Sequence, residues 1–117
     1  GQETTLLRFP GGSSNSVSKF NKGIMTRLTR LVQEKGYSYF DWNVDSDDAG
    51  GTTTAKGVFN NVIKGVKKHK NSVVLQHDTK KYSIDAVEQI IVWGLENGYT
   101  FLPLKNNSLV CHHNIKN

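Results

Sequence analysis

Three short segments of the sequence place acid–base side chains directly after runs of residues that are typical of β-strands. Arg8 follows the first run, a group of aspartates follows the second, and His77 follows the third. In parallel α/β folds, functional groups collect where strands end and helices begin. A carboxylate that orients a histidine and stabilises its charge enables that histidine to donate a proton. The segments therefore predict one acid–base site, and its aspartates come from Asp41, Asp45, Asp47 and Asp48.

Each segment also has a simpler interpretation. Loop 10–15, Pro-Gly-Gly-Ser-Ser-Asn, is typical of a turn followed by helix-capping residues, although its backbone N–H groups could also bind an anion. The aspartate run could be a solvated loop, and it lacks the spacing of an EF-hand. A lone histidine after a strand can be a surface group. The placement of all three segments at successive strand ends favours the catalytic interpretation.

Other motifs with recognisable chemistry are weak or missing. His112 and His113 are adjacent, and adjacent residues seldom bind one metal ion without other partners. Cys111 is the single cysteine, so an intrachain disulfide is excluded. The sequence contains no Gly-x-Gly-x-x-Gly motif, no Walker loop, no Gly-x-Ser-x-Gly elbow and no His-Glu-x-x-His motif. We therefore predict no metal site within this chain.

Composition limits the class of protein. The net charge of +5 would suit an acidic polymer or a negatively charged cell envelope. We expect no nucleic acid partner, because the basic residues are spread out except for four lysines at the end of a predicted helix. No run approaches the roughly 18 apolar residues of a membrane span. Residues 1–5 are polar and unlike a signal peptide, so we expect the chain to start within a domain or after a trimmed segment. The four lysines are Lys64, Lys67, Lys68 and Lys70.

The sequence alternates strand-like runs with amphipathic helical segments. Apolar residues spaced three and four apart indicate the helices, and Ser83 is the expected cap of the last one. Repeated βαβ units form either an open doubly wound sheet or part of a (β/α) barrel. A polar tail over 105–117 is expected to be loosely held. The predicted strands cover 5–9, 37–44, 72–76 and 99–102, and the apolar helix faces cover 17–32, 55–66 and 87–95.

The three segments lie within longer motifs, namely Leu-Arg-Phe-Pro-Gly-Gly-Ser-Ser-Asn at 7–15, Phe-Asp-Trp-Asn-Val-Asp-Ser-Asp-Asp-Ala at 40–49, and Val-Leu-Gln-His-Asp at 74–78. These motifs resemble successive motifs of the polysaccharide deacetylase family, the NodB-homology group of carbohydrate esterases. Segments 98–104 and 112–114 resemble the ends of clostridial-type members. The resemblance implies an α/β fold, namely the C-terminal half of a distorted (β/α) barrel of βαβαβαβ order. Residues 1–104 would form that half of the catalytic domain, and 105–117 the tail.

The resemblance implies metal-assisted hydrolysis of N-acetyl groups on N-acetylglucosamine or N-acetylmuramic acid units of peptidoglycan, chitin or related polymers. His77 matches the general acid that protonates the leaving amine. Asp48 matches the carboxylate that orients this histidine, because it lies in an Asp-x-x-Asp pattern, and Asp45 is the second choice. Arg8 matches the arginine that holds the catalytic-base aspartate.

The resemblance also implies a substrate site. Leu75 matches one wall of the pocket for the acetyl methyl group, and the backbone N–H of Gly11 matches the oxyanion donor. Trp42 lies nearby in the sequence, but it does not match the tryptophan that the family often has where Ala49 stands here. The acetyl pocket of this chain therefore departs from the family pattern.

Two family motifs, Thr-Phe-Asp-Asp and His-x-x-x-His, are missing from the sequence. They supply the general base and the zinc ligands, so we expect zinc or another divalent metal only in the complete domain. Without them we expect the chain alone to be inactive. We also expect it to self-associate or to pair with the missing N-terminal half, because a half barrel leaves open edges. The family implies an extracellular or cell-envelope location and an N-acetylated polysaccharide as the partner.

Two other functions remain open at this stage. The chain could be a non-catalytic glycan-binding or structural remnant of the same fold that keeps Trp42 and the loop at 10–15. It could also be an open α/β domain that binds an anionic ligand at Gly11-Gly12-Ser13. Binding of sugar without acetate release would favour the first, and stabilisation by phosphate that does not depend on His77 would favour the second.

Overall fold

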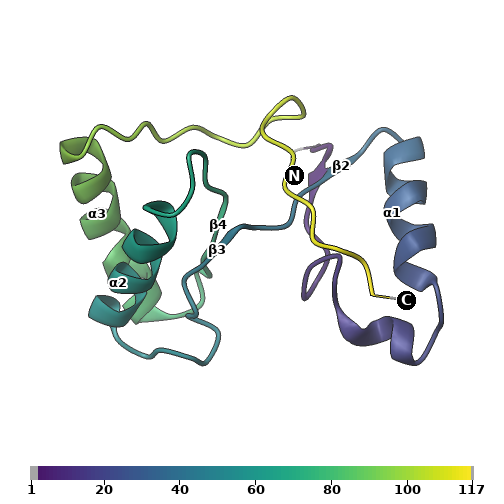
Figure 1. The fold of residues 1–117 in the computed structure, drawn as a ribbon, viewed down its shortest axis with the longest axis horizontal. Helices are drawn as coiled ribbons and strands as arrows, with labels where there is room; N and C mark the ends of the chain where they lie inside the picture. The colour runs from purple at the N-terminus through teal and green to yellow at the C-terminus, as the bar shows by residue number, and fades with distance from the viewer. Residues whose placement is uncertain (1–2, 117) are drawn as a thin grey trace. The chain divides into compact units, whose positions relative to one another are not determined.

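The computed structural model of the chain describes residues 3–116, which form two compact units (Figure 1). Unit 1 comprises Gly1–Asp41 and Leu104–Asn117, and unit 2 comprises Trp42–Pro103. Each unit contains helix together with one parallel pair of short strands. The expected α/β class and the parallel pairing are therefore confirmed. The described strands form two separate pairs, and these pairs do not by themselves constitute a barrel.

Unit 1 begins with strand β1 (Leu6–Leu7), which pairs in parallel with β2 (Ser38–Tyr39). Between them lie the 3₁₀ helix η1 (Ser16–Lys19) and helix α1 (Ile24–Glu34). The Asn15 side chain caps η1 by accepting the Val17 N–H at 3.0 Å. Such a cap satisfies a backbone donor that the helix itself leaves free. The predicted capping role of the polar residues before this segment is confirmed.

The prediction of one continuous helix face over 17–32 is wrong. Gly23 adopts a left-handed backbone with φ of 77°, and α1 starts only after it. Side chains in the preceding 3₁₀ turn therefore do not continue the apolar face of α1, since a 3₁₀ helix has three residues per turn. Phe20 is 89% exposed as a result, and the buried residues of α1 are Met25 and Thr29. The predicted stop is confirmed, because Gly36 is left-handed just after the helix.

Unit 2 contains strand β3 (Val44–Asp45), helix α2 (Ala55–Val66), strand β4 (Val74–Leu75) and helix α3 (Lys81–Glu96). Strands β3 and β4 pair in parallel, with Asp45 opposite Leu75. The predicted single strand over 37–44 is therefore divided, because β2 pairs with β1 whereas β3 pairs with β4. The helix predicted over 55–66 has the observed bounds of α2.

The core of unit 2 lies between α2 and α3. Val58 and Val62 of α2 pack with Ala86 and Ile90 of α3, and each of these side chains is less than 9% exposed. Gly65 allows α2 to approach β3 closely, because a Cβ at this position would lie 2.5 Å from a methyl carbon of Val44. This helix–helix interface therefore contributes hydrophobic stabilisation to unit 2.

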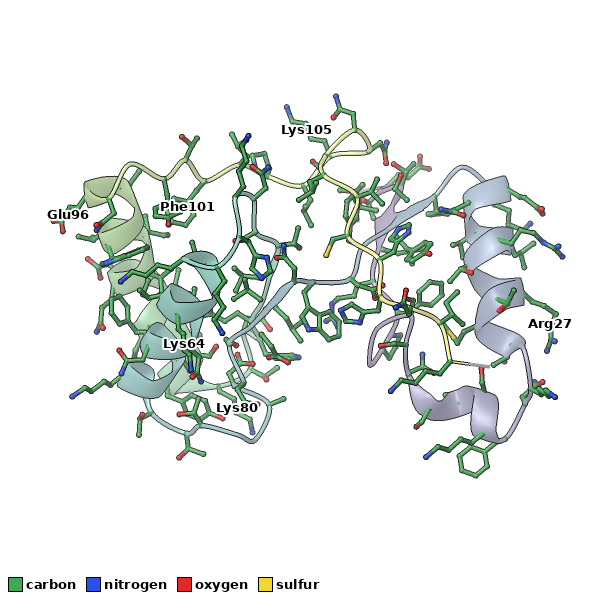
Figure 2. The ribbon with its side chains drawn as sticks, in the orientation of Figure 1. Arg27, Lys64, Lys80, Glu96, Phe101 and Lys105 are labelled. Carbon is green, nitrogen blue, oxygen red and sulfur yellow. The ribbon has the colours of Figure 1, made fainter. Side chains whose placement is uncertain are left out.

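The strand predicted over 99–102 is absent, since the described residues place no strand there. This segment folds back onto the end of α3 instead. The Tyr99 N–H donates to the Gly94 carbonyl at 2.9 Å, and the Tyr99 ring stacks on Trp93 with centroids 5.3 Å apart. Phe101 packs over Gly94, where a Cβ would lie 2.5 Å from its ring (Figure 2). The aromatic side chains that suggested a strand are thus used in packing on a helix.

The tail was expected to be loosely held, but its described part makes specific hydrogen bonds within unit 1. Thr5 donates its hydroxyl to the Asn106 side chain at 3.0 Å, and the Asp41 N–H donates to the Cys111 carbonyl at 2.8 Å. The tail therefore adds backbone and side-chain partners to a unit that has only two short strands. Within residues 3–116, no helix has the length and apolar character that crossing a membrane requires.

We expect Ile90→Ala to destabilise the chain by about 2–5 kcal/mol, because it removes a buried side chain and leaves a cavity in the α2–α3 interface. Ile84→Ala is the matched control on the same helix, since Ile84 is 53% exposed and should change stability by less than about 0.5 kcal/mol. Urea unfolding followed by circular dichroism measures both. Equal losses in the two variants would show that this interface is not the core of unit 2.

Candidate active site

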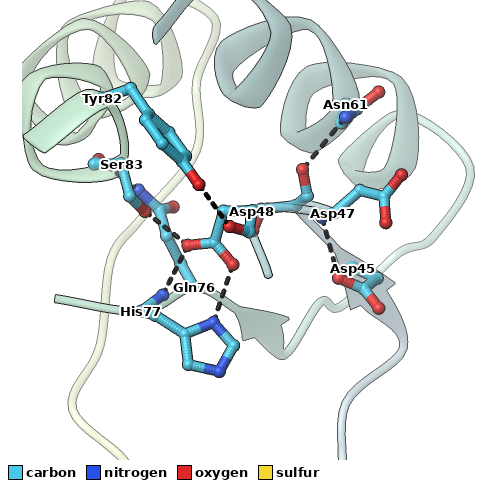
Figure 3. Close-up of polar contacts among 9 residues, drawn as sticks. Asp45, Asp47, Asp48, Asn61, Gln76, His77, Tyr82 and Ser83 are labelled. Carbon is cyan, nitrogen blue, oxygen red and sulfur yellow. Dashed lines mark hydrogen bonds and ion pairs between the residues drawn. The ribbon is translucent and has the colours of Figure 1, made fainter. Parts of the chain in front are cut away.

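Unit 2 brings His77 and Asp48 together in one hydrogen-bonded pair (Figure 3). The Asp48 side chain has no exposed surface, and its Oδ1 lies 2.7 Å from His77 Nδ1. Its Oδ2 accepts the His77 backbone N–H at 2.6 Å and also the Ser83 hydroxyl. Both oxygens of one carboxylate are therefore used, and they tie the loop after β3 to the end of β4 and to the first turn of α3.

The Asp48 carboxyl is ionised. Burial alone raises its pKa, but the hydrogen bonds from His77 and Ser83 outweigh burial and hold the pKa below its ordinary value. An ionised carboxylate has no proton to donate, so the shared proton belongs to His77 Nδ1. The second ring nitrogen, Nε2, is then left for proton exchange. The His77 side chain is 33% exposed, so other molecules can reach the ring.

The register of the parallel strands explains why these two residues meet. Asp45 in β3 lies opposite Leu75 in β4, so the residues that follow both strands leave the sheet at the same edge. The Tyr82 hydroxyl donates to the Asp48 carbonyl at 2.8 Å and steadies the loop from α3. Because His77 comes two positions after Leu75, it reaches the carboxylate by both its backbone and its ring.

Asp45 has a different part in the structure from Asp48. It is exposed, and its Oδ1 accepts the backbone N–H of Asp47 at 2.8 Å. This bond supports a turn in which Asp47 has a left-handed φ of 61°, a conformation that aspartate tolerates better than most residues. Asp45 therefore shapes the loop, and the carboxylate in contact with His77 is that of Asp48.

The residues predicted to contact substrate in unit 2 lie close to the pair in sequence. Leu75 is half-buried in β4, and Trp42 is half-buried at the start of the unit. A surface cavity of about 660 Å³ borders His77, but neither Leu75 nor Trp42 lines it. Its walls come largely from apolar side chains of α3. The lining residues are Gln76, His77, Asp78, Ile84, Val87, Glu88, Ile91 and Val92.

Arg8 and Gly11 lie in unit 1, in the loop after β1. Both are exposed, and Gly11 has a left-handed φ of 72° that glycine adopts without strain. The Gly12 N–H donates to the Phe9 carbonyl at 2.8 Å and closes the turn. The Gly11 N–H donates to no backbone acceptor within residues 3–116. The structure thus describes these two residues within unit 1 and the His77–Asp48 pair within unit 2.

The sequence did not predict the part that two residues, Ser83 and Asp41, have in the buried hydrogen bonds of the two units. Ser83 was expected to cap α3, but the N-cap residue is Lys80 and the Ser83 hydroxyl instead donates to Asp48. Asp41 was noted only as one of several strand-end aspartates. Its side chain is 1% exposed and accepts the Ser13 N–H at 2.7 Å. One feature of the sequence could have pointed to Asp41. An aspartate follows each of two strands, because Asp41 comes after β2 as Asp48 comes after β3.

The Asp41 carboxylate influences the groups around it. Burial raises its pKa, but hydrogen bonds from Ser13 and His113 outweigh burial, so the pKa lies below its ordinary value. Burial raises the pKa of the Cys111 thiol, and the nearby Asp41 charge adds to this effect. Burial and Asp41 likewise raise the pKa of Tyr39. Cys111 and Tyr39 are therefore neutral near pH 7.

A metal site of the kind that the family resemblance implies does not fit the described residues. Across residues 3–116, no group of three or more His, Cys, Asp and Glu side chains could hold a metal ion. The vicinal pair His112 and His113 therefore gains no third ligand of these types within that range.

Comparison with known proteins identifies similar solved structures. No family model matches the chain, and no curated protein matches it. The chain is similar to the catalytic domain of peptidoglycan N-acetylglucosamine deacetylase from Eubacterium rectale ATCC 33656, with 52% identity and a TM-score of 0.93 over 99% of this chain and 54% of that one. It is also similar to a Streptococcus mutans CE4 esterase, with 25% identity and a TM-score of 0.65 over 85% of this chain and 43% of that one. The chain thus spans about half the length of the solved structures it matches.

We expect the buried Asp48 carboxylate to make the chain sensitive to acid. Folding lowers its pKa below the ordinary 3.8, so the carboxylate adds stability above about pH 4, and this stability is lost as the pH falls through the folded pKa. Urea unfolding at a series of pH values should show Asp48→Asn less stable than wild type at neutral pH. The difference between the two should shrink below about pH 4.

Asp47→Asn is the matched control for this measurement, because Asp47 is the exposed neighbour of Asp48 and asparagine tolerates its left-handed backbone. This variant should stay close to wild type throughout the pH series. A stability difference for Asp48→Asn that remains constant into strong acid would contradict the assignment of an ionised carboxylate.

Proposed function

We infer that this chain is part of a polysaccharide deacetylase catalytic domain, as the resemblance of its three motifs predicted. We propose that it provides the proton-donating side of the active site of a metal-dependent N-acetylglucosamine deacetylase. The observation that carries this proposal is the 2.7 Å contact between His77 Nδ1 and the fully buried Asp48 carboxylate. It is supported by the 52% identity to the Eubacterium rectale domain.

In this proposal His77 is the general acid of amide hydrolysis. When the bond between the acetyl carbon and the amide nitrogen breaks, Nε2 of His77 gives its proton to the leaving amine. The Asp48 carboxylate stabilises the protonated ring before the transfer and keeps Nδ1 directed toward itself, so that Nε2 faces outward. Ser83 and the His77 backbone N–H keep Asp48 ionised and in place.

The other predicted residues are assigned roles that depend on the assembled domain. The Gly11 N–H would donate to the oxygen of the acetyl group as negative charge develops on it. Arg8 would hold the catalytic-base aspartate, Leu75 would contact the acetyl methyl group, and Trp42 would contact the sugar. We propose that the base and the metal ion, zinc or another divalent cation, are supplied by the part of the domain that has no counterpart here. The complete domain would then be a distorted (β/α) barrel.

The proposed substrate class follows from the named relative. The Eubacterium rectale protein is a peptidoglycan N-acetylglucosamine deacetylase. We propose that the present chain acts on the same class of N-acetylated polysaccharide and that its place of action is the cell envelope. By itself, without the partner half, it should release no acetate.

A hybrid domain tests the proposal. The matched part of the Eubacterium rectale catalytic domain is replaced by this chain, and acetate release from an N-acetylglucosamine oligomer is measured with added zinc. We expect the hybrid to be active and this chain alone to be inactive. His77→Ala in the hybrid should lower kcat by about 10²–10⁴-fold, the usual contribution of a general acid.

His69→Ala is the matched control, because His69 is an exposed histidine just beyond α2 and should leave kcat unchanged. A hybrid that folds and binds the oligomer but releases no acetate would overturn the proposal and favour a glycan-binding remnant. A hybrid in which His77→Ala is as active as wild type would refute the role of His77 while leaving the deacetylase activity intact.

A further inference from the structure

Asp41 holds together three segments of unit 1 that are far apart in the sequence. Its side chain is 1% exposed. Oδ1 accepts the Ser13 backbone N–H at 2.7 Å, and Oδ2 accepts the His113 backbone N–H at 2.8 Å. The Ser13 hydroxyl donates to Oδ2 as well. The carboxylate thus joins the end of β2, the loop after β1 and the C-terminal tail at one point.

The hydrogen bonds around Asp41 require a carboxylate, and the neutral amide of an asparagine cannot accept all of them. Asp41 accepts two backbone N–H groups, one on each oxygen. An asparagine offers one acceptor oxygen, and its NH₂ group would face the second backbone N–H in either orientation. One buried donor would then lack an acceptor, which is unfavourable. Asp41→Asn therefore changes the hydrogen bonding at this point while it preserves the shape of the side chain.

The loop that Asp41 holds is the one that carries Gly11. Ser13 is fully buried, whereas Gly11, two positions earlier, is exposed. The Asn15 side chain donates to the Gly12 carbonyl at 2.8 Å and braces the loop from the other side. Gly11 and Gly12 both have left-handed backbones, so neither position can relax into an ordinary extended strand without breaking the turn. The path of the backbone from Gly11 to Ser13 is therefore constrained at its end by the bond from Ser13 to Asp41.

Asp41 also anchors the C-terminal tail, through the His113 backbone N–H. The side chains of His112 and His113 make further contacts that hold the tail in place. The His112 ring stacks on Tyr39 with centroids 3.8 Å apart and planes 7° from parallel. His112 Nε2 also lies 2.9 Å from the Tyr39 carbonyl oxygen, and His113 Nδ1 lies 3.0 Å from the Ser14 hydroxyl. These rings are thus used to fasten the tail over the end of β2 and over the loop.

We propose that Asp41 is a positioning residue that fixes the Gly11 N–H in the direction needed for oxyanion stabilisation, with the His113 backbone of the tail as a structural member of the same centre. This inference rests on the proposed deacetylase function and extends it to residues outside the acid pair. Asp41 acts through Ser13 and the loop, and it does not touch the reacting atoms.

The hybrid domain again provides the test. Asp41→Asn should lower kcat for the N-acetylglucosamine oligomer by about tenfold or more, because removal of an oxyanion donor costs about 10²–10³-fold and misplacement costs part of that. KM should stay near the wild-type value, since the donor acts on charge that develops only in the transition state. Rates are compared per folded molecule, with the folded fraction measured by thermal unfolding. Amide hydrogen exchange at Gly12, whose N–H is bonded to the Phe9 carbonyl, should become faster.

Two further variants make the test decisive. Asp85→Asn, which alters an exposed aspartate paired with Lys81, should leave kcat, KM and loop exchange unchanged. Ser13→Ala removes only the hydroxyl bond to Asp41 and should give a smaller fall in kcat with KM unchanged. If Asp41→Asn does not fold, Ser13→Ala decides the question.

The outcomes separate the two proposals. An active hybrid whose folded Asp41→Asn and Ser13→Ala variants keep the wild-type kcat would overturn the positioning role and leave the deacetylase proposal standing. A fall in kcat with unchanged loop exchange would also overturn it, because Asp41 would then act by another route. A wild-type hybrid without activity would overturn the deacetylase proposal and, with it, the catalytic purpose of the loop.

Discussion

A carboxylate that is withdrawn from water must receive hydrogen bonds on both of its oxygens, and this requirement organises each half of the molecule. Asp48 in unit 2 and Asp41 in unit 1 are each no more than 1% exposed. An isolated charge at such a site would be strongly unfavourable. Each carboxylate meets the requirement by taking backbone N–H groups together with a serine hydroxyl, from Ser83 in one unit and Ser13 in the other.

The short strands explain why so much depends on these two side chains. Each parallel pair contains only two residues per strand, so the backbone ladder contributes little cohesion. Asp48 adds contacts between the loop after β3, the end of β4 and the start of α3. Asp41 adds contacts between β2, a glycine-rich loop and the tail. In both units the charged group replaces hydrogen bonds that a longer sheet would have supplied.

The same hydrogen bonds also position the groups that take part in the proposed reaction. Asp48 orients His77 because one of its oxygens faces the ring while the other is held by the backbone. Asp41 holds Ser13, which lies two positions after Gly11 in the same loop. Stability and function are therefore coupled at both centres, and a substitution there is expected to change both. The apolar interface of α2 and α3 is the part of unit 2 where stability can be altered with less direct effect on these groups.

Much of the local structure could be predicted from the sequence. The periodic apolar positions of α2 indicated its bounds, and glycines after α1 and α3 marked where those helices stop. Asp48 was also predicted, from its place in the Asp-x-x-Asp pattern, although through resemblance to a family and not through spacing alone. These features are local, because a cap, a helix face or a strand end depends on a few neighbouring residues.

Other features depend on groups that are distant in the sequence. The apolar residues at 17 and 20 matched the period of α1, but the left-handed Gly23 separates them from that helix. The aromatic run at 99–102 had the composition of a strand, yet its rings pack on Gly94 and Trp93 of α3. Whether such a run pairs or packs depends on which surface is available to it, and its own composition does not specify that surface.

The sequence by itself determined which segments contain helices, that the strands are parallel, and which histidine and aspartate are the candidates for acid chemistry. Only the tertiary structure decided that Ser83 serves Asp48 instead of capping a helix, and that Asp41 binds both Ser13 and His113. The physical reason is that a buried charge selects its hydrogen-bond donors by position in space. Those donors lie 28 to 72 residues away along the chain, beyond the reach of any local pattern.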